Sequence, residues 1–340
     1  MRFGSAVAWS APNADAGSFA NPAYAALLEH DCSILVSENE LKWQSLQPAN
    51  GPHDFTRFDA ILNYAEARGM AMRGHTLVWH QSRWMPAWLE SYNFGPSPAA
   101  EAERILTGHI QTVCRRYGSR IVSYDVVNEA VVPGTGLLYE TALSRALGGA
   151  HKTIDLAFHT ARTEAPNAQL VYNDYMNWEP GSERHRSGVL ELLRGFRARG
   201  VPVDALGLQS HLTISASTPV ATLVANHAPA WRAFLDEVVA MGYKLVVTEL
   251  DVRDDGLPAD TAVRDRAVAD YARGYLDIAF TYPHRRDVLV WGMCDKYSWL
   301  QRVPRADGQP RRPCPYDAAF TAKPMHEAIN AAFAAAAARS

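Results

Sequence analysis

Short apolar runs alternate with longer amphipathic stretches along the chain. Eight runs rich in Val, Ile and Leu predict buried strands, at Phe3–Ala8, Ser33–Val36, Ala71–Val78, Ile121–Val127, Gln169–Tyr172, Ala205–Gln209, Lys244–Thr248 and Val288–Trp291. Longer stretches between them predict helices, at Phe58–Arg68, Ala99–Tyr117, His151–Glu164, Arg184–Arg199, Val220–Met241 and Arg264–Phe280. Eight alternating units favour an α/β fold, a closed (β/α)8 TIM barrel.

A doubly wound open sheet is the structural alternative to the barrel. Such a sheet normally carries a glycine-rich phosphate turn after its first strand. The segment Phe3–Ala6 is no such turn, and the pair Gly134 and Gly136 has Tyr139 where the third glycine would stand. Because no Pro/Gly/Ser-rich linker or change in composition divides the chain, we expect a single domain over residues 1–340.

Composition excludes several classes of protein. With 48% hydrophobic and 20% charged residues among 340, the chain has the composition of a globular protein with a large core. The net charge is -3 and no Lys/Arg run could follow a phosphate backbone, so we expect no nucleic-acid partner. The longest mostly apolar stretch, Ala331–Ala338, is far shorter than the roughly 20 residues that span a bilayer, so we expect no membrane association.

Metal and disulfide signals are weak. The four cysteines, Cys32, Cys114, Cys294 and Cys314, form neither a C-x-x-C pair nor a zinc-type pattern with histidine. His75 and His80 also lack a second ligand at metal spacing, so we expect no metal and no cofactor. Only Cys294 and Cys314 are close enough in sequence to pair, and free thiols and one disulfide both stay open for them.

Polar and aromatic residues close the predicted strands, where a barrel of this type carries its reactive groups. Glu129 and Glu249 each directly follow a strongly apolar run. Either glutamate alone would be explained more simply by a salt bridge or a helix N-cap. Two carboxyl groups aimed into one cavity are what glycosidic cleavage requires, one as an acid and the other as a nucleophile or base. The pair therefore favours a glycosidase.

Tryptophan supports a sugar-binding rim. Of nine tryptophans, five lie in predicted strand ends or rim loops: Trp43, Trp79, Trp88, Trp291 and Trp299. Flat indoles beside hydrogen-bonding side chains suit sugar rings, whose faces are apolar and whose edges carry hydroxyl groups. We expect core positions for Trp9, Trp178 and Trp231, near which no polar residues cluster. The absence of H-E-x-x-H, G-x-S-x-G and Walker motifs weakens metalloprotease, serine hydrolase and NTPase interpretations.

Seven ordered blocks of sequence resemble glycoside hydrolase family 10, the endo-β-1,4-xylanases. They are Glu38-Asn39 with Lys42-Trp43; Arg73–His80; Asp125–Ala130; Asn173–Tyr175; Gln209–Leu212; Thr248–Val252; and Trp291-Gly292 with Asp295 and Ser298-Trp299. The resemblance runs from Phe3 to about Ile329. It implies hydrolysis of internal β-1,4-xylosidic bonds of xylan and xylo-oligosaccharides by a retaining double displacement on a barrel.

The resemblance also implies roles for individual residues. Glu129 would be the general acid/base and Glu249 the nucleophile, while Asn128 would hold the 2-hydroxyl group of the cleaved sugar. His211, bridged to Asp251, would orient Glu249, and we expect Asn128 to share in binding its carboxylate. The residues implied in substrate binding are Glu38, Asn39, Lys42, His75, Trp79 and Gln209 along the glycone side, Trp291 and Trp299 over the sugars, and Tyr172 on the aglycone side.

The sequence departs from the family pattern at three places. Tyr124 stands where the family usually has Trp, and Met176 where it usually has Asn. The segment Gln81–Met85 makes the loop before Pro86 longer than usual, so we assign Gln81 no sugar contact. Within that loop, Arg83 or Trp84 is a candidate for reshaping the glycone end.

Two other functions stay open from the sequence. The same chemistry on a β-1,4-glucan or an aryl cellobioside would differ only in whether the pocket accepts a hydroxymethyl group. A non-catalytic polysaccharide-binding barrel should have lost a carboxylate, and both are present. We expect a monomer whose partners are xylan and xylo-oligosaccharides. Because polymeric xylan lies outside the cell while the N-terminus shows no signal peptide, we expect a secreted or periplasmic protein whose signal was trimmed, or a cytoplasmic enzyme for imported oligosaccharides.

Overall fold

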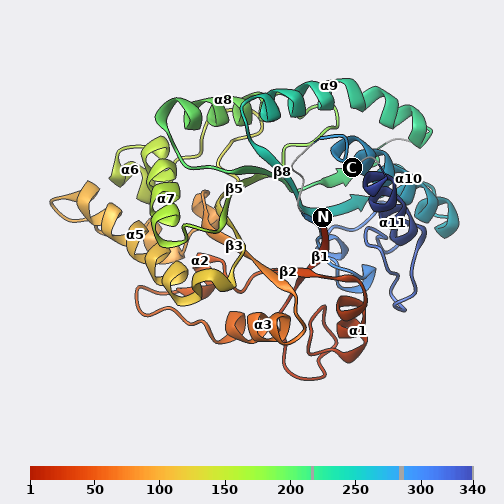
Figure 1. The fold of residues 1–340 in the computed structure, drawn as a ribbon, viewed down its shortest axis with the longest axis horizontal. Coiled ribbons are helices and arrows are strands. Elements are labelled where there is room, and N and C mark those ends of the chain that lie inside the picture. The colour runs from red at the N-terminus through yellow and green to blue at the C-terminus, as the bar shows by residue number, and fades with distance from the viewer. Residues whose placement is uncertain (216–217, 283–286, 339–340) are drawn as a thin grey trace.

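Helices surround a ring of strands in the computed structural model, which describes residues 1–215, 218–282 and 287–338 (Figure 1). The strands are β1 (Arg2–Val7), β2 (Ile34–Ser37), β3 (Ala71–Trp79), β4 (Ser123–Asn128), β5 (Gln169–Asp174), β6 (Ala205–Leu208), β7 (His211–Thr213), β8 (Lys244–Arg253) and β9 (Asp287–Val290). The α-helices are α1 (Pro22–Asp31), α2 (Trp43–Leu46), α3 (Thr56–Ala67), α4 (Ala87–Glu90), α5 (Pro98–Tyr117), α6 (Ala142–Leu147), α7 (Ala150–Glu164), α8 (Glu183–Arg199), α9 (Val220–Ala240), α10 (Thr261–Ala279) and α11 (Pro324–Ala337). Short 3-10 turns are η1 (Ser82–Trp84), η2 (Gly118–Arg120), η3 (Asp295–Tyr297) and η4 (Trp299–Arg302).

The strands close into a barrel. Neighbours around the ring run β1, β2, β3, β4, β5, β6, β8 and β9, and the pairing of β9 with β1 completes it. Every pairing is parallel. The short strand β7 continues the path of β6 and pairs with the far end of β8. The predicted (β/α)8 TIM barrel is therefore confirmed.

All the predicted strands and helices are present, but some elements were not predicted. Strand β8 runs on to Arg253, well beyond the predicted end at Thr248. Helix α11 (Pro324–Ala337) was not predicted, although its buried residues Met325, Ile329, Ala332 and Ala336 follow a helical period; its many alanines make that period weak in the sequence. Tertiary contacts hold it, since the ring of Phe333 lies 5.3 Å from that of Phe280 and 6.3 Å from that of Phe3.

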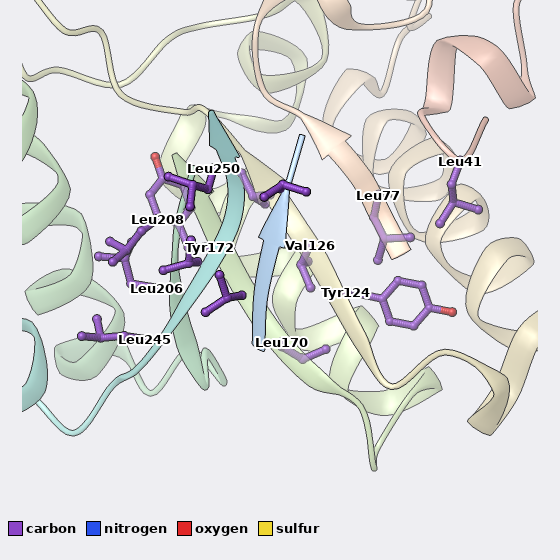
Figure 2. Close-up of a cluster of buried hydrophobic side chains, with 14 of the residues drawn as sticks. Leu41, Leu77, Tyr124, Val126, Leu170, Tyr172, Leu206, Leu208, Leu245 and Leu250 are labelled. Carbon is purple, nitrogen blue, oxygen red and sulfur yellow. The ribbon is translucent and has the colours of Figure 1, made fainter. Parts of the chain in front are cut away.

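The main core lies between the strands and the helices that cover them. Figure 2 shows part of it, with Leu77, Val126, Leu170, Tyr172, Leu206 and Leu245 labelled among the buried side chains. The opposite faces of the strands form two smaller clusters of buried side chains: Ala6, Ile34, Val36, Leu289 and Trp291 in one, and Val171, Ala205 and Val246 in the other. Both faces of each strand are thus buried, as expected for a parallel barrel.

A buried ion pair supports the floor of the barrel mouth. Nη2 of Arg73 lies 2.5 Å from Oδ1 of Asp125, and Nδ1 of His75 lies 3.0 Å from Oδ2 of the same carboxylate. Burial by itself would raise the pKa of Asp125, but the charges of Arg73 and His75 and their hydrogen bonds outweigh it and lower that pKa. This pairing fixes the imidazole of His75 at the mouth of the barrel.

Several features of the described residues bear on the chemistry. All four cysteines are buried and free, so the alternative of a Cys294–Cys314 disulfide is wrong. Within the described ranges, no group of three or more His, Cys, Asp or Glu side chains is arranged to hold a metal ion. None of the described helices is long and apolar enough to cross a membrane.

Candidate active site

A cavity of about 610 Å³ opens at the carboxyl ends of the strands. Its lining consists of Glu38, Asn39, Lys42, His75, Trp79, Arg83, Trp84, Asn128, Glu129, Tyr175, Asn177, Glu179, Ser182, Gln209, His211, Thr213, Glu249, Trp291, Trp299 and Arg302. Twelve of the fourteen site residues predicted from the sequence are in this set. The exceptions are Asp251, which lies behind His211, and Tyr172.

A second cavity, of about 530 Å³, opens at the opposite ends of the strands. Its charged groups are already paired within the protein, because Arg2 bonds to Asp287 and Arg115 bonds to Glu164. It offers no pair of free carboxyl groups, so the chemistry belongs to the first cavity.

Three hydrogen bonds hold the carboxyl group of Glu129. Nε1 of Trp79 donates to Oε2 at 2.8 Å, Nε2 of Gln81 donates to the same oxygen at 3.0 Å, and Nε2 of Gln209 donates to Oε1 at 2.9 Å. The backbone of Glu129 has φ +53°, a left-handed conformation that costs energy for a residue other than glycine. This conformation at the end of β4, together with the three donors, sets the direction of the side chain.

Glu129 binds its proton unusually tightly. Burial raises its pKa to about 7, and the negative charges of Asp174 and Glu249 add to this effect. The hydrogen bonds from Gln209 and Trp79 favour the ionised form and oppose the shift without cancelling it. Glu129 is therefore protonated in mildly acidic solution, as a general acid must be.

Glu249 lies inside β8 and is held as a carboxylate. Nδ2 of Asn173 donates to its Oε1 at 2.7 Å, and Nε2 of His211 lies 3.1 Å from its Oε2. Burial alone would raise the pKa of Glu249, but the His211 hydrogen bond and the nearby charges of His75 and His211 prevail and lower it. Glu249 is thus ionised under conditions in which Glu129 keeps its proton.

His211 links the nucleophile candidate to a second carboxylate. Its Nδ1 lies 2.9 Å from Oδ1 of Asp251, and Nε1 of Trp299 donates to Oδ2 of Asp251 at 2.8 Å. Burial would lower the pKa of His211, but the charges and hydrogen bonds of Asp251 and Glu249 raise it to about 10. Both ring nitrogens therefore carry protons and donate, one to each carboxylate.

Asn128 does not hydrogen-bond Glu249, so that part of the expectation is wrong. Its Oδ1 instead accepts from Nδ2 of Asn173 at 2.9 Å and from Nε2 of Gln209 at 3.3 Å. Asn173 takes the place next to Glu249 because Gly207 leaves room for it: a Cβ on Gly207 would lie 2.2 Å from Oδ1 of Asn173. Among the described residues, Nδ2 of Asn128 has no acceptor, which leaves it for a ligand in the cavity.

The predicted glycone residues meet around Lys42. Its Nζ donates to Oδ1 of Asn39 at 2.9 Å and lies 4.8 Å from the ring centroid of Trp79. Burial lowers the pKa of Lys42, while the charges of Glu249, Glu38 and Glu129 oppose that shift. Hydrogen-bonding groups thus stand beside indole faces, a combination that suits a sugar ring.

Tyr172 does not face the cavity, and its predicted aglycone role is wrong. Its side chain is fully buried, accepts from the backbone N–H of Ala130 at 3.1 Å and donates to Asp174. The ring packs toward Phe196 of α8. Successive residues of a strand face opposite sides, so Asn173 points into the mouth and Tyr172 away from it. Tyr175, beyond the end of β5, lines the cavity instead.

Two of the five tryptophans expected at the rim do not line the cavity. Trp43 is buried and stacks on His109 at 4.0 Å, and Trp88 donates to the backbone oxygen of Gln47, so neither lines the cavity. Trp178 and Trp231 are in the core as predicted. Trp9 is half-buried beneath the guanidinium group of Arg57.

Gln81 and Asn173 are the functional residues that sequence reasoning missed. Gln81 donates to both the backbone oxygen and the carboxylate of Glu129. The unusual length of its loop obscures this role in the sequence, although the position of Gln81 two residues beyond β3 places it at the rim. Asn173 stood in a quoted block, and its position directly before Asp174 at the end of an apolar strand was the available signal.

A third carboxyl group, Glu179, lines the other end of the cavity. Burial raises its pKa to about 7, against the effect of its hydrogen bonds. Its Oε1 already accepts from the backbone N–H of Thr213 at 2.7 Å and from Nε1 of Trp178 at 3.1 Å. Because these bonds tie it to the protein framework, Glu179 supports the loop rather than competing with Glu129 and Glu249 as a reacting pair.

Comparisons with known proteins agree with this geometry. The family model described as Glycosyl hydrolase family 10 matches residues 2–332. The chain is 30% identical over 322 residues to Endo-1,4-beta-xylanase 3 of Hypocrea jecorina, covering 93% of this chain and 79% of that protein. It is 29% identical over 327 residues to Endo-1,4-beta-xylanase C of Phanerodontia chrysosporium, covering 94% and 75% of the two chains.

Solved structures show the same likeness. Native xylanase 10B from Thermotoga maritima superposes with a TM-score of 0.83 at 27% identity, covering 98% of this chain and 94% of that one. Xylanase 10B from Thermotoga petrophila, in complex with xylobiose, gives the same TM-score of 0.83 and identity of 27%, over 98% and 93% of the two chains. A family match over nearly the whole length, on a barrel that places two glutamates in one cavity, shows that the chain belongs to glycosyl hydrolase family 10.

Proposed function

We propose that the protein is an endo-1,4-β-xylanase that cleaves internal bonds of xylan and xylo-oligosaccharides with retention of configuration. The observation that carries the proposal is the contrast between two carboxyl groups in one cavity. Burial raises the pKa of Glu129 to about 7, whereas hydrogen bonding and positive charge lower that of Glu249. Two identical side chains are thereby prepared for opposite tasks.

In the first step, the Glu249 carboxylate attacks the anomeric carbon while Glu129 gives its proton to the departing glycosidic oxygen. The product is a glycosyl ester on Glu249, and the leaving chain departs as an alcohol. In the second step, ionised Glu129 takes a proton from water, whose oxygen displaces Glu249. Esterification removes the negative charge of Glu249, which lowers the pKa of Glu129 and suits it to act as a base.

The neighbouring side chains position these two groups. Asn173 and His211 aim the oxygens of Glu249, and Gln81, Gln209 and Trp79 aim those of Glu129. The free Nδ2 of Asn128 is available to the 2-hydroxyl group of the sugar. Such hydrogen bonds strengthen in the transition state, when positive charge develops on the sugar ring.

Xylan is better supported as the substrate than a β-1,4-glucan, and catalysis is better supported than binding alone. The curated relatives reported above are named endo-1,4-β-xylanases, and one solved relative holds xylobiose. A purely binding barrel would not need a protonated and an ionised carboxyl group side by side. A glucan would need room for a hydroxymethyl group beside the indoles of Trp291 and Trp299, which face the cavity.

Reducing-sugar release from xylan and from carboxymethylcellulose tests the proposal. We expect release from xylan to dominate, β-configured first products by NMR, and loss of activity in Glu249→Gln. Equal release from both polymers would favour the glucanase alternative. No release from either by a folded protein would favour a binding barrel, and α-configured first products would refute retention.

We further propose that residues 1–340 act as one catalytic domain and as a monomer, outside the cytoplasm. Polymeric xylan cannot enter a cell, so a cytoplasmic enzyme would meet only imported oligosaccharides. Light scattering of the purified chain tests the monomer. Assay of secreted or periplasmic and cytoplasmic fractions of the source cells tests the compartment, and activity confined to the cytoplasmic fraction would contradict it.

A further inference from the structure

Arginines in this protein are usually neutralised by carboxylates. Among the described residues, most arginines lie within 4.0 Å of an Asp or Glu oxygen; Arg264, for example, is 2.6 Å from Asp254 and Arg312 is 2.6 Å from Asp265. The described arginines without such a partner are Arg57, Arg83, Arg184, Arg197, Arg232 and Arg302. Two of these, Arg83 and Arg302, line the active-site cavity.

Arg83 lies at the outer end of a stack of flat groups. Its guanidinium carbon is 5.2 Å from the ring centroid of Trp84, and that ring stacks on Trp79 at 4.5 Å with an angle of 17°. Nε of Arg83 donates to Oε1 of Gln81 at 3.1 Å. This one bond fixes the plane of the guanidinium group and leaves the terminal N–H groups without an acceptor among the described residues.

Arg302 approaches the same cavity from another loop. It ends η4, which begins at Trp299 and carries that indole into the cavity. Burial raises the pKa of Glu38, and the positive charges of Lys42 and Arg302 oppose that shift. Arg302 and Glu38 therefore line the same cavity, and Arg302 follows Trp299 on the same short turn.

The carboxylates of the cavity do not supply partners for these arginines. Glu129 and Glu249 are held by the hydrogen bonds described above, and neither Arg83 nor Arg302 forms an ion pair with a carboxylate of the described residues. A neutral xylose chain needs no exposed cation at the rim. Guanidinium groups bind carboxylates through two parallel hydrogen bonds, and they do so best where one face is already stacked on a ring.

We infer that Arg83 and Arg302 form a binding site for a uronic acid side group on the glycone part of the substrate. The xylose backbone would lie across the indoles, and the carboxylate of its side group would reach the rim. The inference rests on the proposed xylanase function and specifies its substrate as acidic, glucuronic-acid-decorated xylan.

A matched pair of substrates tests the inference. One is a neutral xylo-oligosaccharide, and the other is the same chain with one glucuronic acid on a glycone xylose. The ratio of their kcat/KM values is measured for the natural protein, for Arg83→Gln, for Arg302→Gln and for the double variant. Taking the ratio within each variant cancels any effect that Arg83 has on Glu129 through Gln81.

We expect each substitution to lower the acidic-to-neutral ratio by roughly three- to tenfold, as for a partly exposed charge-assisted bond. Arg57→Gln serves as the matched control, because Arg57 is also unpaired but lies over Trp9 away from the cavity. Its ratio should stay unchanged. If the ratio is the same in all variants, the arginines do not recognise the acidic side group and the inference is wrong. If Arg57→Gln lowers the ratio as much as the other substitutions do, the effect is long-range electrostatic attraction and no binding site exists. Failure of the neutral oligosaccharide itself would instead count against the proposed function.

Discussion

Glu129 and Glu249 differ in what surrounds them and not in their own chemistry. Burial raises the pKa of Glu129, and the negative charges of Asp174 and Glu249 add to it against hydrogen bonds from neutral donors. Glu249 is also buried, but one of its hydrogen bonds comes from the charged imidazole of His211. Both groups are screened from water, so these contacts weigh more than they would at the surface. At the scale of single residues, the electrostatic surroundings of each carboxyl group therefore determine which one acts as the acid and which as the nucleophile.

The first prediction separates the two roles. Glu249→Ala should abolish formation of the glycosyl-enzyme on every substrate, because no other group can attack the anomeric carbon. Glu129→Ala should still react with an aryl glycoside whose leaving group needs no proton, and azide should speed its turnover. Burst kinetics with and without azide measure this. The azide product of the Glu129 variant should keep the β configuration, because azide attacks the glycosyl-enzyme. An inverted azide product from the Glu129 variant, with a retained one from the Glu249 variant, would reverse the assignment.

The second prediction concerns pH. Glu129 acts as an acid only while protonated, so kcat/KM should fall as pH rises through about 7. Glu249 acts only while ionised, and its lowered pKa puts the acidic limb below the usual range of a glutamate.

Glu129→Gln provides the control for this profile, assayed on an activated aryl substrate. The alkaline limb should disappear and the acidic limb should remain. An alkaline limb that survives near pH 7 would point to another group. A limb that moves to higher pH would point to His211, whose pKa is raised to about 10. The apparent pKa values read from the two limbs belong to Glu129 and Glu249 as a pair.

At the scale of elements, short turns that follow the strands place tryptophan side chains along the walls of the cavity. η1 presents Trp84 beside Trp79 of β3, and η4 presents Trp299, whose Nε1 also holds Asp251. Trp84 and Trp299 are each 36% exposed, unusually high for indoles, as expected for surfaces that a sugar covers. The loops therefore set specificity, while the strands set the catalytic pair.

The third prediction concerns Trp299. We expect it to close the space beside C5 of the bound sugar, where glucose carries a hydroxymethyl group. Trp299→Ala should shift the preference between aryl xylobioside and aryl cellobioside toward glucose by roughly 10- to 200-fold, the range that small pocket differences give. Trp299→Phe loses the hydrogen bond to Asp251 but keeps a ring, so its ratio of kcat/KM values should stay near the natural one. An unchanged ratio in Trp299→Ala would remove this role.

At the scale of the whole molecule, buried charge ties distant segments to the rim. Asp254, directly after β8, is fully buried and lies 2.6 Å from Arg264 of α10 and 3.5 Å from both Arg305 and Arg311 of the C-terminal segment. One carboxylate thus joins three cations from two parts of the chain. Its loss would leave Arg264 buried without a carboxylate partner, whereas Arg305 and Arg311 would each keep one other carboxylate.

The fourth prediction follows from this network. Asp254→Asn should lower the free energy of unfolding by about 3–5 kcal/mol, as expected when one partner of a buried ionic cluster is removed. Asp255→Asn is the matched control, because Asp255 is partly exposed and pairs with Arg253 and Arg311. It should cost no more than about 1 kcal/mol. Urea unfolding measures both, and equal losses would show that the burial of Asp254 is unimportant.

The barrel, the family and the two glutamates could all be predicted from the amino-acid sequence. Apolar runs of strand length alternating with helices leave few other folds, and a polar residue that closes such a run must lie at the barrel rim. Glu129 and Glu249 satisfy this condition, and both line the cavity.

The side chains that hydrogen-bond Glu129 and Glu249 could not be predicted in this way, because they depend on the three-dimensional arrangement of the strands and loops. Strands buried on both faces show no alternation of polar and apolar residues, so the pattern could not tell that Tyr172 faces the helices while Asn173 faces the mouth. Hydrogen-bond partners depend on the register between strands and on the path of loops, which brought Asn173 to Glu249 and Gln81 to Glu129. The pKa values followed from the same source, because burial and charge at a site are summed over residues far apart in the chain.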